Sequence, residues 1–446
     1  MTQKLIHIIG GGLAGCEAAW QAAELGCTVK LFEMKPEKYS PAHSSDALAE
    51  LVCSNSLRSN AKTSAVGLLK EEMRLSGALL VRIADETAVP AGQALAVNRE
   101  HFAAKVTEII SAHPRIELIH GEQVELKRNP DIPTILATGP LTSSAMAESL
   151  AQLTGKERLA FYDAIAPIVS YESLDMEIIY SKSRWQDGPG DYLNCPFTKE
   201  QYLAFIDALG KGKTVPLKEF EEEKYFEGCL PVEVMQSRGE DTLRYGPMKP
   251  VGLRDPKTGR DPYAAVQLRM ENREGSTYNL VGFQTKLTYP EQERIFRMIP
   301  GMENADFVRL GSIHRNTFVC APDLLNQSLQ LKDAPEIYLA GQLSGVEGYV
   351  ESMAMGMLAG INAARSVLGR AIIPPPPQTA LGALIFHLTQ TDPDNFQPSN
   401  VNFGLFPAWE KKVPKKLRGE KRLEISMAAL KKWHNELLQE DSPPPS

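Results

Sequence analysis

The feature that most constrains this chain is a run of glycines close to its N-terminus. Residues 4–9 are mostly apolar and predict a buried strand, residues 13–26 are rich in alanine and predict a helix, and residues 28–33 predict a second strand. The sequence Gly-Gly-Gly-Leu-Ala-Gly, residues 10–15, falls between the first strand and the helix. This order of strand, glycine-rich turn and helix is typical of a βαβ unit that binds a dinucleotide.

The glycines of this turn have separable roles. Gly10 permits the tight turn, Gly12 leaves room for a pyrophosphate at the N-terminus of the helix, and Gly15 lets the helix pack close to the sheet. Glu33 ends the second strand, 23 residues after Gly10. A carboxylate there accepts a hydrogen bond from a ribose 2′-hydroxyl and disfavours a 2′-phosphate. We therefore expect a dinucleotide site here; the alternative is a glycine-rich turn without a ligand.

A second glycine-rich turn bears on the choice between NAD and FAD. Residues 337–340 predict a buried strand, and residues 341–349, which begin with Gly341, lead into a predicted helix at 350–367. A helix N-terminus favours the anionic reduced form of a flavin, so FAD fits two such turns better than NAD does. The alternative is a second turn in the same sheet without a ligand. We expect cofactor contacts at Gly10, Gly11, Gly12, Leu13, Ala14, Gly15, Glu33, Gly139, Gly341 and Val346.

The length of 446 residues predicts two or three structural units. Residues 133–137 read as another strand of the first sheet, whereas residues 170–305 carry aromatic and β-branched runs between turn residues. We expect an α/β fold: a Rossmann-like FAD-binding domain interrupted by a smaller β-rich α+β insertion domain. The predicted boundaries are 1–170 and 306–370 for the FAD-binding domain, 171–305 for the insertion and 371–446 for a helical tail.

Composition excludes several classes of protein. Apolar residues make up 43% of the chain and charged residues 23%, as in soluble globular proteins. No stretch approaches the ~18 uninterrupted apolar residues that span a bilayer, and the first strand runs into glycines instead of a cleavage site. The six cysteines form no Cys-x-x-Cys pair, which argues against a zinc site or a disulfide framework. We expect a cytoplasmic protein without a metal and without a membrane partner.

The charge distribution has one notable feature. A net charge of −7 argues against a uniformly basic nucleic-acid binder. Residues 411–422, however, contain seven basic residues and one acidic residue. Such a concentration on an acidic chain favours contact with a phosphate backbone, and the alternative is a solvated start of a helix.

Several short strings of this sequence are distinctive when taken together. They are residues 10–15, 41–43 (Pro-Ala-His), 52–57 (Val-Cys-Ser-Asn-Ser-Leu), 191–196 (Asp-Tyr-Leu-Asn-Cys-Pro), 246–253 (Gly-Pro-Met-Lys-Pro-Val-Gly-Leu), 314–316 (His-Arg-Asn) and 345–349 (Gly-Val-Glu-Gly-Tyr). With these strings the chain resembles the folate- and FAD-dependent tRNA (uracil-5-)-methyltransferases. The resemblance implies that a flavin reduced by NADH or NADPH takes the methylene group of 5,10-methylenetetrahydrofolate and delivers it to C5 of the T-loop uridine (uracil-54) of tRNA, giving 5-methyluridine.

The resemblance implies that Cys53 and Cys229 serve catalysis. Uracil C5 is a poor nucleophile until a thiolate adds at C6, so this chemistry needs a cysteine and a base. We assign Cys229 as the C6 nucleophile and Cys53 as the partner that helps remove the C5 proton, with the exchanged assignment left open. Other cysteines, including Cys195, are interpreted as packing residues.

Substrate contacts are predicted at two further places. His314, Arg315 and Asn316 would stack and pair with folate, although a histidine satisfied in a loop is the alternative. Lys415, Lys416 and Arg418 are the candidates for tRNA phosphates. Two alternative functions remain. The first is an FAD-dependent oxidoreductase that acts on a small metabolite. The second is a flavin-bound RNA-binding protein without turnover, which would need neither Cys53 nor Cys229.

Overall fold

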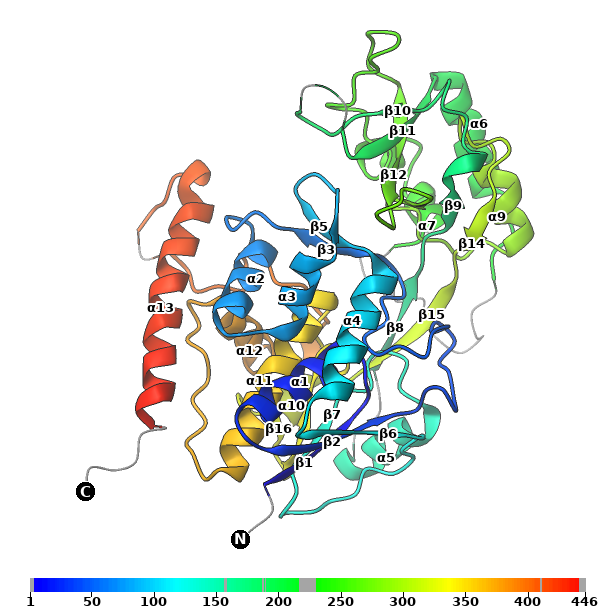
Figure 1. Cartoon of the computed structure of the whole chain (residues 1–446). Coiled ribbons are helices and arrows are strands. Elements are labelled where there is room, and N and C mark those ends of the chain that lie inside the picture. Colours follow the sequence, from blue (N-terminus) through cyan, green and yellow to red (C-terminus); the bar gives the residue numbers. More distant parts are fainter. Residues whose placement is uncertain are drawn as a thin grey trace.

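The computed structural model describes residues 4–155, 159–186, 188, 190–215, 230–409 and 411–440. Figure 1 shows two unequal parts: a larger one built around β1, β2 and β7, and a smaller one that contains β10, β11 and β12. Two long segments, β8 and β15, run between the parts in this view. They pair with each other antiparallel, so the chain enters and leaves the smaller part along one two-stranded ribbon.

The larger part is organised by a six-stranded sheet of order β16-β17-β7-β1-β2-β6. All its pairings are parallel except that of β16 with β17. Short apolar runs form its central strands because both faces of a parallel sheet are covered. The strands predicted at 4–9, 28–33, 133–137 and 337–340 are all present. Their bounds are β1 Leu5–Ile9, β2 Thr28–Glu33, β6 Ile116–His120, β7 Thr134–Leu136, β16 Gln330–Leu331 and β17 Ala334–Leu339.

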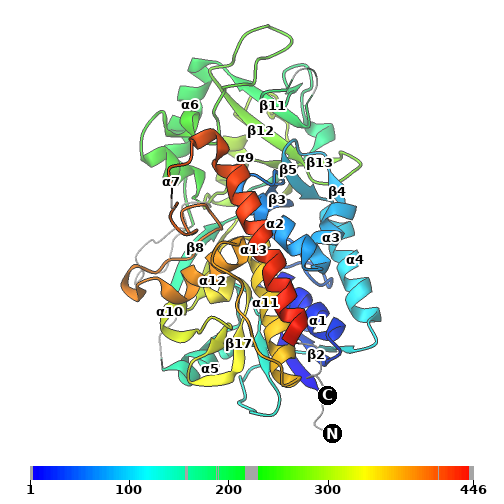
Figure 2. The same ribbon diagram turned by 90° about the vertical axis from the view of Figure 1, so that its left-hand side faces the viewer.

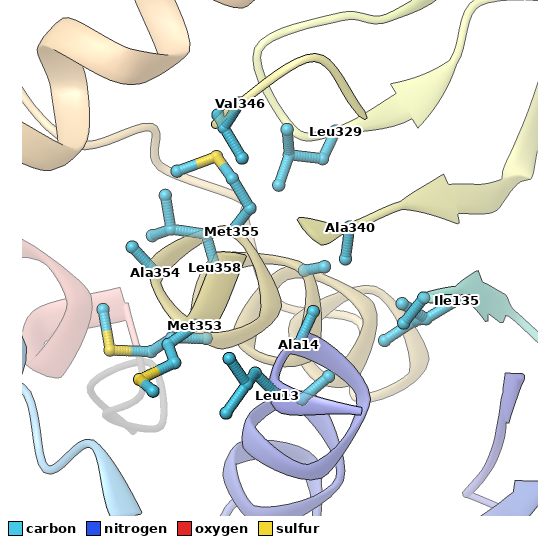
Figure 3. Close-up of a cluster of buried hydrophobic side chains, with 14 of the residues drawn as sticks. Leu13, Ala14, Ile135, Leu329, Ala340, Val346, Met353, Ala354, Met355 and Leu358 are labelled. Atoms are coloured by element: carbon cyan, nitrogen blue, oxygen red, sulfur yellow. The ribbon is translucent and has the colours of Figure 1, made fainter. Parts of the chain in front are cut away.

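Two helices, α1 (Leu13–Glu24) and α11 (Tyr349–Val367), pack against each other at backbone distance. A Cβ atom on Gly356 would lie 2.2 Å from the carbonyl oxygen of Ala14, and one on Gly360 would lie 2.4 Å from that of Ala18. Figure 3 shows the apolar side chains around this contact. The small residues of α11 therefore place the beginnings of both helices beside the same edge of the sheet.

The smaller part is built on a second, antiparallel sheet of order β10-β11-β12-β13-β9-β14. It has its own apolar core, in which Phe205, Phe283 and Phe296 are buried. The β-rich insertion predicted between the two halves of the first sheet is thus present, and the predicted fold class is confirmed. The domain boundaries at 170, 305 and 370 stay predictions. The strands are β9 Ile168–Ser170, β10 Tyr180–Ser181, β11 Tyr192–Phe197, β12 Ala264–Met270, β13 Thr277–Leu280 and β14 Phe307–Arg309, and the helices are α6 Lys199–Gly210, α7 Val232–Ser237, α8 Thr242–Tyr245 and α9 Tyr289–Phe296.

The C-terminal residues cover the larger part. Figure 2 shows α13 (Arg418–Glu440) lying lengthwise across the molecule, and this helix packs against α2. Trp433 of α13 is buried, and its indole Nε1 donates a hydrogen bond to the carbonyl oxygen of Ile373 at 2.8 Å. The remaining elements are β3 Ser56–Ser59, α2 Ala65–Leu75, α3 Leu79–Glu86, β4 Ala88–Val89, β5 Ala94–Val97, α4 Arg99–Ala112, α5 Ser144–Thr154, β8 Leu159–Ala164, β15 Ile313–Phe318, α10 Ala321–Leu324 and α12 Ala380–Gln390, with 3₁₀ turns at Tyr171–Ser173, Gly341–Ser344, Pro393–Asn395 and Lys415–Leu417.

Over the described ranges, no helix is long and apolar enough to cross a membrane. Among the same residues, no group of three or more histidine, cysteine, aspartate or glutamate side chains is arranged to hold a metal ion.

Candidate active site

A cavity of about 420 Å³ lies where the carboxyl ends of β1, β2 and β7 meet the beginnings of α1 and α11. Crevices at this edge of a parallel sheet are the usual ligand sites of such folds. The second sheet also contributes: Arg269 on β12 and Asn279 on β13 line the same cavity. The cavity is therefore shared by the two parts of the molecule.

Most of the predicted cofactor residues line this cavity, and two do not. Gly15 packs instead, since its Cβ would lie 1.8 Å from the carbonyl oxygen of Gly10. Val346 does not line the cavity either: its side chain is fully buried in the apolar core, and Figure 3 shows it beside Leu329 and Met355. The lining residues are Gly10, Gly11, Gly12, Leu13, Ala14, Glu33, Gly139 and Gly341.

The first glycine turn has open space where a pyrophosphate would lie. A Cβ atom on Gly12 would meet no protein atom of the described residues within 4 Å. Glu33 stands beside it, and its carboxylate accepts hydrogen bonds from the backbone N–H groups of Gly11 at 2.7 Å and Lys35 at 2.9 Å. Glu33 thus also shapes the turn, a role that the sequence did not indicate. Each carboxylate oxygen has a second lone pair with which to accept from a ribose hydroxyl.

The residues present fit FAD at both ends of the cavity. The first turn offers backbone N–H groups at the start of α1, and the second, from Gly341 to Tyr349, leads into α11. On the part of the cavity wall that β13 contributes, the buried Nδ2 of Asn279 has no hydrogen-bond partner among the described residues. An unpaired buried amide that lines a cavity favours a polar ligand, because leaving it unpaired costs about 1–3 kcal/mol.

Cys53 lines the same cavity and contacts the beginning of α11. Its Sγ lies 2.9 Å from the phenol oxygen of Tyr349. The same oxygen accepts hydrogen bonds from the backbone N–H groups of Cys53 at 2.8 Å and Ser54 at 3.3 Å. Burial, followed by the Cys53 charge, raises the pKa of Tyr349 well above its usual value. Tyr349 therefore keeps its proton at neutral pH and can donate it in a hydrogen bond to a thiolate at Cys53.

The surroundings of Cys53 are cationic. Arg269 is buried and donates to Asn55 Oδ1 at 2.9 Å and to Ser54 Oγ at 2.7 Å, the two residues that follow Cys53. Arg269 and Arg309 both interact electrostatically with Cys53, and burial lowers the pKa of each guanidinium. Arg99 holds the preceding residues by donating to the Leu51 carbonyl oxygen at 2.8 Å. Positive charge of this kind favours the thiolate form of a cysteine.

The other predicted residues are distributed as follows. Cys229 lies outside the described residues. His314 and Arg315 belong to β15, whose backbone is described, and Asn316 of the same strand is buried and lines the cavity. Lys415 and Lys416 are exposed on a 3₁₀ turn, Arg418 is exposed at the start of α13, and none of the three lines the cavity.

One basic residue of the segment 411–422 is not exposed on the protein surface. Arg422 is buried, its guanidinium lies 3.9 Å from the centre of the Trp409 ring, and it donates to the Pro407 carbonyl oxygen at 2.7 Å. Arg422 therefore adds to the charge of the segment, but its guanidinium is held within the tail by Trp409 and Pro407.

Sequence reasoning missed several residues of the site. Lys35 is buried at the cavity and donates to the carbonyl oxygen of Ser45 at 3.1 Å, which holds the loop before Cys53. Arg58 and Glu351 form an ion pair that joins β3 to α11. Only Tyr349 had a sequence signal, since it ends the glycine-rich string at 345–349.

Comparisons with known proteins identify the family of this chain. The family model of glucose inhibited division protein A matches residues 5–371. The chain is 67% identical to the methylenetetrahydrofolate–tRNA-(uracil-5-)-methyltransferase TrmFO of Desulfotalea psychrophila over 96% of this chain and 97% of that protein. It is 58% identical to the protein of the same name from Geobacter sulfurreducens, over 96% of this chain and 98% of that one.

A solved structure extends the agreement to the fold. The structure of Aquifex aeolicus GidA in its form I crystal has a TM-score of 0.71 at 16% identity, covering 97% of this chain and 75% of that one. With relatives of such identity over almost their full length, the chain belongs to the methylenetetrahydrofolate–tRNA-(uracil-5-)-methyltransferases, within the wider family of glucose inhibited division protein A.

Proposed function

We propose that this protein transfers the one-carbon unit of 5,10-methylenetetrahydrofolate to C5 of the T-loop uridine of tRNA, giving 5-methyluridine, with FAD as its cofactor and NADH or NADPH as reductant. The observation that carries the proposal is the position of Cys53, in one cavity with both glycine turns and beside Tyr349. An oxidoreductase acting on a small metabolite is not favoured, because the full-length relatives bear the methyltransferase name.

The cavity residues divide into those that hold cofactor and those that act on uracil. Gly12 and Glu33 would hold the ADP half of FAD, and Asn279 and Gly341 its other half. FAD, when bound, supplies the reducing equivalents that turn the transferred methylene group into a methyl group. His314, Arg315 and Asn316 of β15 are the proposed folate contacts, and Asn316 lines the cavity.

Two thiols would carry the nucleophilic and proton-transfer steps. A thiolate at Cys229 adds to uracil C6, and the electron pair of the C5=C6 bond becomes available at C5 to attack the methylene carbon. The carbon–nitrogen bond that held this carbon to its donor breaks, and its electron pair stays on the nitrogen. The C5 proton then leaves with help from Cys53, and the C6–S bond breaks to release the first thiolate. Arg269 and Tyr349 would keep Cys53 in its anionic, proton-accepting form, the first by charge and the second by a hydrogen bond.

The roles of the two thiols can be separated by trapping. Cys229→Ala should bind tRNA and FAD but form no covalent adduct with a T-arm containing 5-fluorouridine. Cys53→Ala should still permit addition at C6 and accumulate an adduct on ordinary tRNA, since elimination is blocked. Both variants should lose turnover by at least about 100-fold, the lower end of the contribution of a positioned acid or base.

The matched control is Cys195→Ala. Cys195 is fully buried in β11 and does not line the cavity, so its loss should lower stability by about 1–3 kcal/mol and leave turnover intact. Gel-shift trapping, flavin absorbance and thermal unfolding are measured on all three variants. If Cys229→Ala traps RNA and Cys53→Ala does not, the two roles are exchanged; normal methylation by either variant would remove that cysteine from the mechanism.

A further inference from the structure

An exposed aromatic patch lies on the smaller part of the molecule, outside the cavity. Trp185 is 80% exposed, Tyr245 72% and Val251 46%. Tyr245 directly precedes the loop of residues 246–253, which resembles the family in sequence but has no part in the mechanism above, and Val251 lies within that loop. Large exposed apolar side chains mark interaction sites where they lie together, as Trp185 and Val251 do through the hydrogen bond from Arg184 to the Val251 carbonyl oxygen.

Specific contacts hold the tryptophan on this loop. The guanidinium of Arg184 donates to the carbonyl oxygens of Lys249 at 2.7 Å and Val251 at 2.5 Å, which joins the chain at Trp185 to the loop. A Cβ atom on Gly252 would lie 3.4 Å from two atoms of the indole ring, so the ring lies over that glycine. Trp185 also has a positive φ of 63°, a conformation that costs a non-glycine residue about 1–2 kcal/mol. An exposed and strained tryptophan contributes little to folding.

The same loop reaches the cavity at its other end. A Cβ atom on Gly282 would lie 2.6 Å from the Cβ of Pro247, so the loop packs directly on Gly282, which lines the cavity. Met248 is fully buried, and its carbonyl oxygen accepts a hydrogen bond from the Ala265 N–H at 3.0 Å. The loop is therefore a fixed connection between the cavity wall and the aromatic patch.

The charge within residues 249–260 is positive, and the exposed residues Glu240, Asp241 and Asp261 flank this range. Residues 249–260 contain four basic residues and a single acidic one, Asp255, which is buried. The basic residues are Lys249, Arg254, Lys257 and Arg260, and all four are exposed. Aromatic rings among exposed cations suit single-stranded nucleic acid, because bases stack on the rings while the cations meet phosphates. A purely apolar partner would not need the cations.

We propose that Trp185, with Tyr245 and Lys249, forms a second tRNA contact, in which an unpaired base near the target uridine stacks on the Trp185 ring. This inference rests on the proposed function, which supplies tRNA as the substrate. The contact would hold the T-loop against the cavity wall through the loop 246–253, independently of the basic segment at 411–422.

The test measures binding of tRNA and not turnover. Trp185→Ala should raise the Kd about tenfold, within the range expected for loss of one stacked base, while Trp185→Phe should keep most of the affinity. The slope of log affinity against log salt should not change in Trp185→Ala, since no cation is removed. In Lys249→Ala that slope should flatten by about 0.7 to 0.9.

The control is Tyr289→Ala, which removes another exposed aromatic ring from the same part of the molecule, at the start of α9. It should leave the Kd unchanged, and flavin absorbance should be the same in all variants. Unchanged tRNA affinity in Trp185→Ala overturns the proposal, and if that variant alters the oligomeric state instead, the patch is an interface between copies of this chain. Failure of the unsubstituted protein to bind tRNA would contradict the proposed function itself.

Discussion

Gly12 and Gly15 belong to one turn but require glycine for different reasons. At Gly12, a side chain would enter space that the described protein atoms leave open, next to the cavity. At Gly15, a side chain would collide with the backbone of Gly10. The first position therefore limits ligand binding, and the second limits how closely α1 approaches the sheet.

This difference predicts opposite outcomes for two substitutions that each add one methyl group. Gly12→Ala should fold with equal or slightly higher stability, by about 0.4–1 kcal/mol, and should purify with much less FAD. Gly15→Ala should be destabilised by about 1–3 kcal/mol because the helix must shift. Flavin absorbance and thermal unfolding of the FAD-free proteins separate the two effects. Full FAD occupancy in Gly12→Ala would remove this turn from the cofactor site.

The residue contacts show what a sequence can and cannot predict. The glycine turn and Glu33 were predictable because they are local and have a fixed spacing. The contact of Cys53 with Tyr349 joins residues 296 positions apart, and that of Arg269 with Ser54 joins residues 215 apart. No periodicity or spacing relates such positions, so the environment of Cys53 required the folded structure.

At the scale of elements, α2 connects the tail to the body through one buried carboxylate. Glu72 accepts hydrogen bonds from the N–H groups of Ala380 at 2.6 Å and Leu381 at 2.9 Å, at the start of α12, and from the hydroxyl of Ser426 on α13. Burial raises the pKa of Glu72 from 4.5 to about 7 against these hydrogen bonds. Three helices thus depend on a group that changes charge near neutral pH.

A defined pH dependence of stability follows. Because the folded-state pKa of Glu72 is raised, its contribution is fully present below the unfolded-state pKa of 4.5 and is lost as pH rises through about 7. Relative to Glu72→Gln, which does not titrate, the unsubstituted protein should lose up to about 3 kcal/mol of unfolding free energy over this range. Denaturant unfolding at several pH values measures the difference, with the exposed Glu420→Gln as control. A constant difference between pH 4.5 and 7 would show that Glu72 stays ionised.

At the scale of the whole molecule, the sequence predicted the fold class. It did not predict which part of the molecule contributes residues to the cavity. Apolar runs that end at glycines predicted the parallel sheet, and the change to aromatic and β-branched runs predicted the insertion. The insertion was expected as a separate unit, yet Arg269 and Asn279 form part of the cofactor cavity. In the strands of the insertion, apolar and polar residues alternate as in other half-buried sheets. This pattern does not reveal that two of the strands also line a cavity in the larger part of the molecule.

The charge of the whole molecule gives the last prediction. Lys415, Lys416 and Arg418 are exposed together at the start of α13 on a chain of net charge −7. If they meet tRNA phosphates, replacing all three with alanine should weaken binding and flatten the plot of log affinity against log salt by about 0.7 to 0.9 for each lost contact. FAD content should not change, because none of the three lines the cavity.

A matched pair of cations on the same helix provides the control. Lys431 and Lys432 are also exposed on α13, more than ten residues further along. Replacing both with alanine removes charge from the helix but leaves its basic start unchanged. If net charge alone mattered, the slope of log affinity against log salt would therefore also change in this double variant. A slope changed only by the triple substitution locates the phosphates at the start of α13, whereas an unaltered slope there would make this segment a solvated surface.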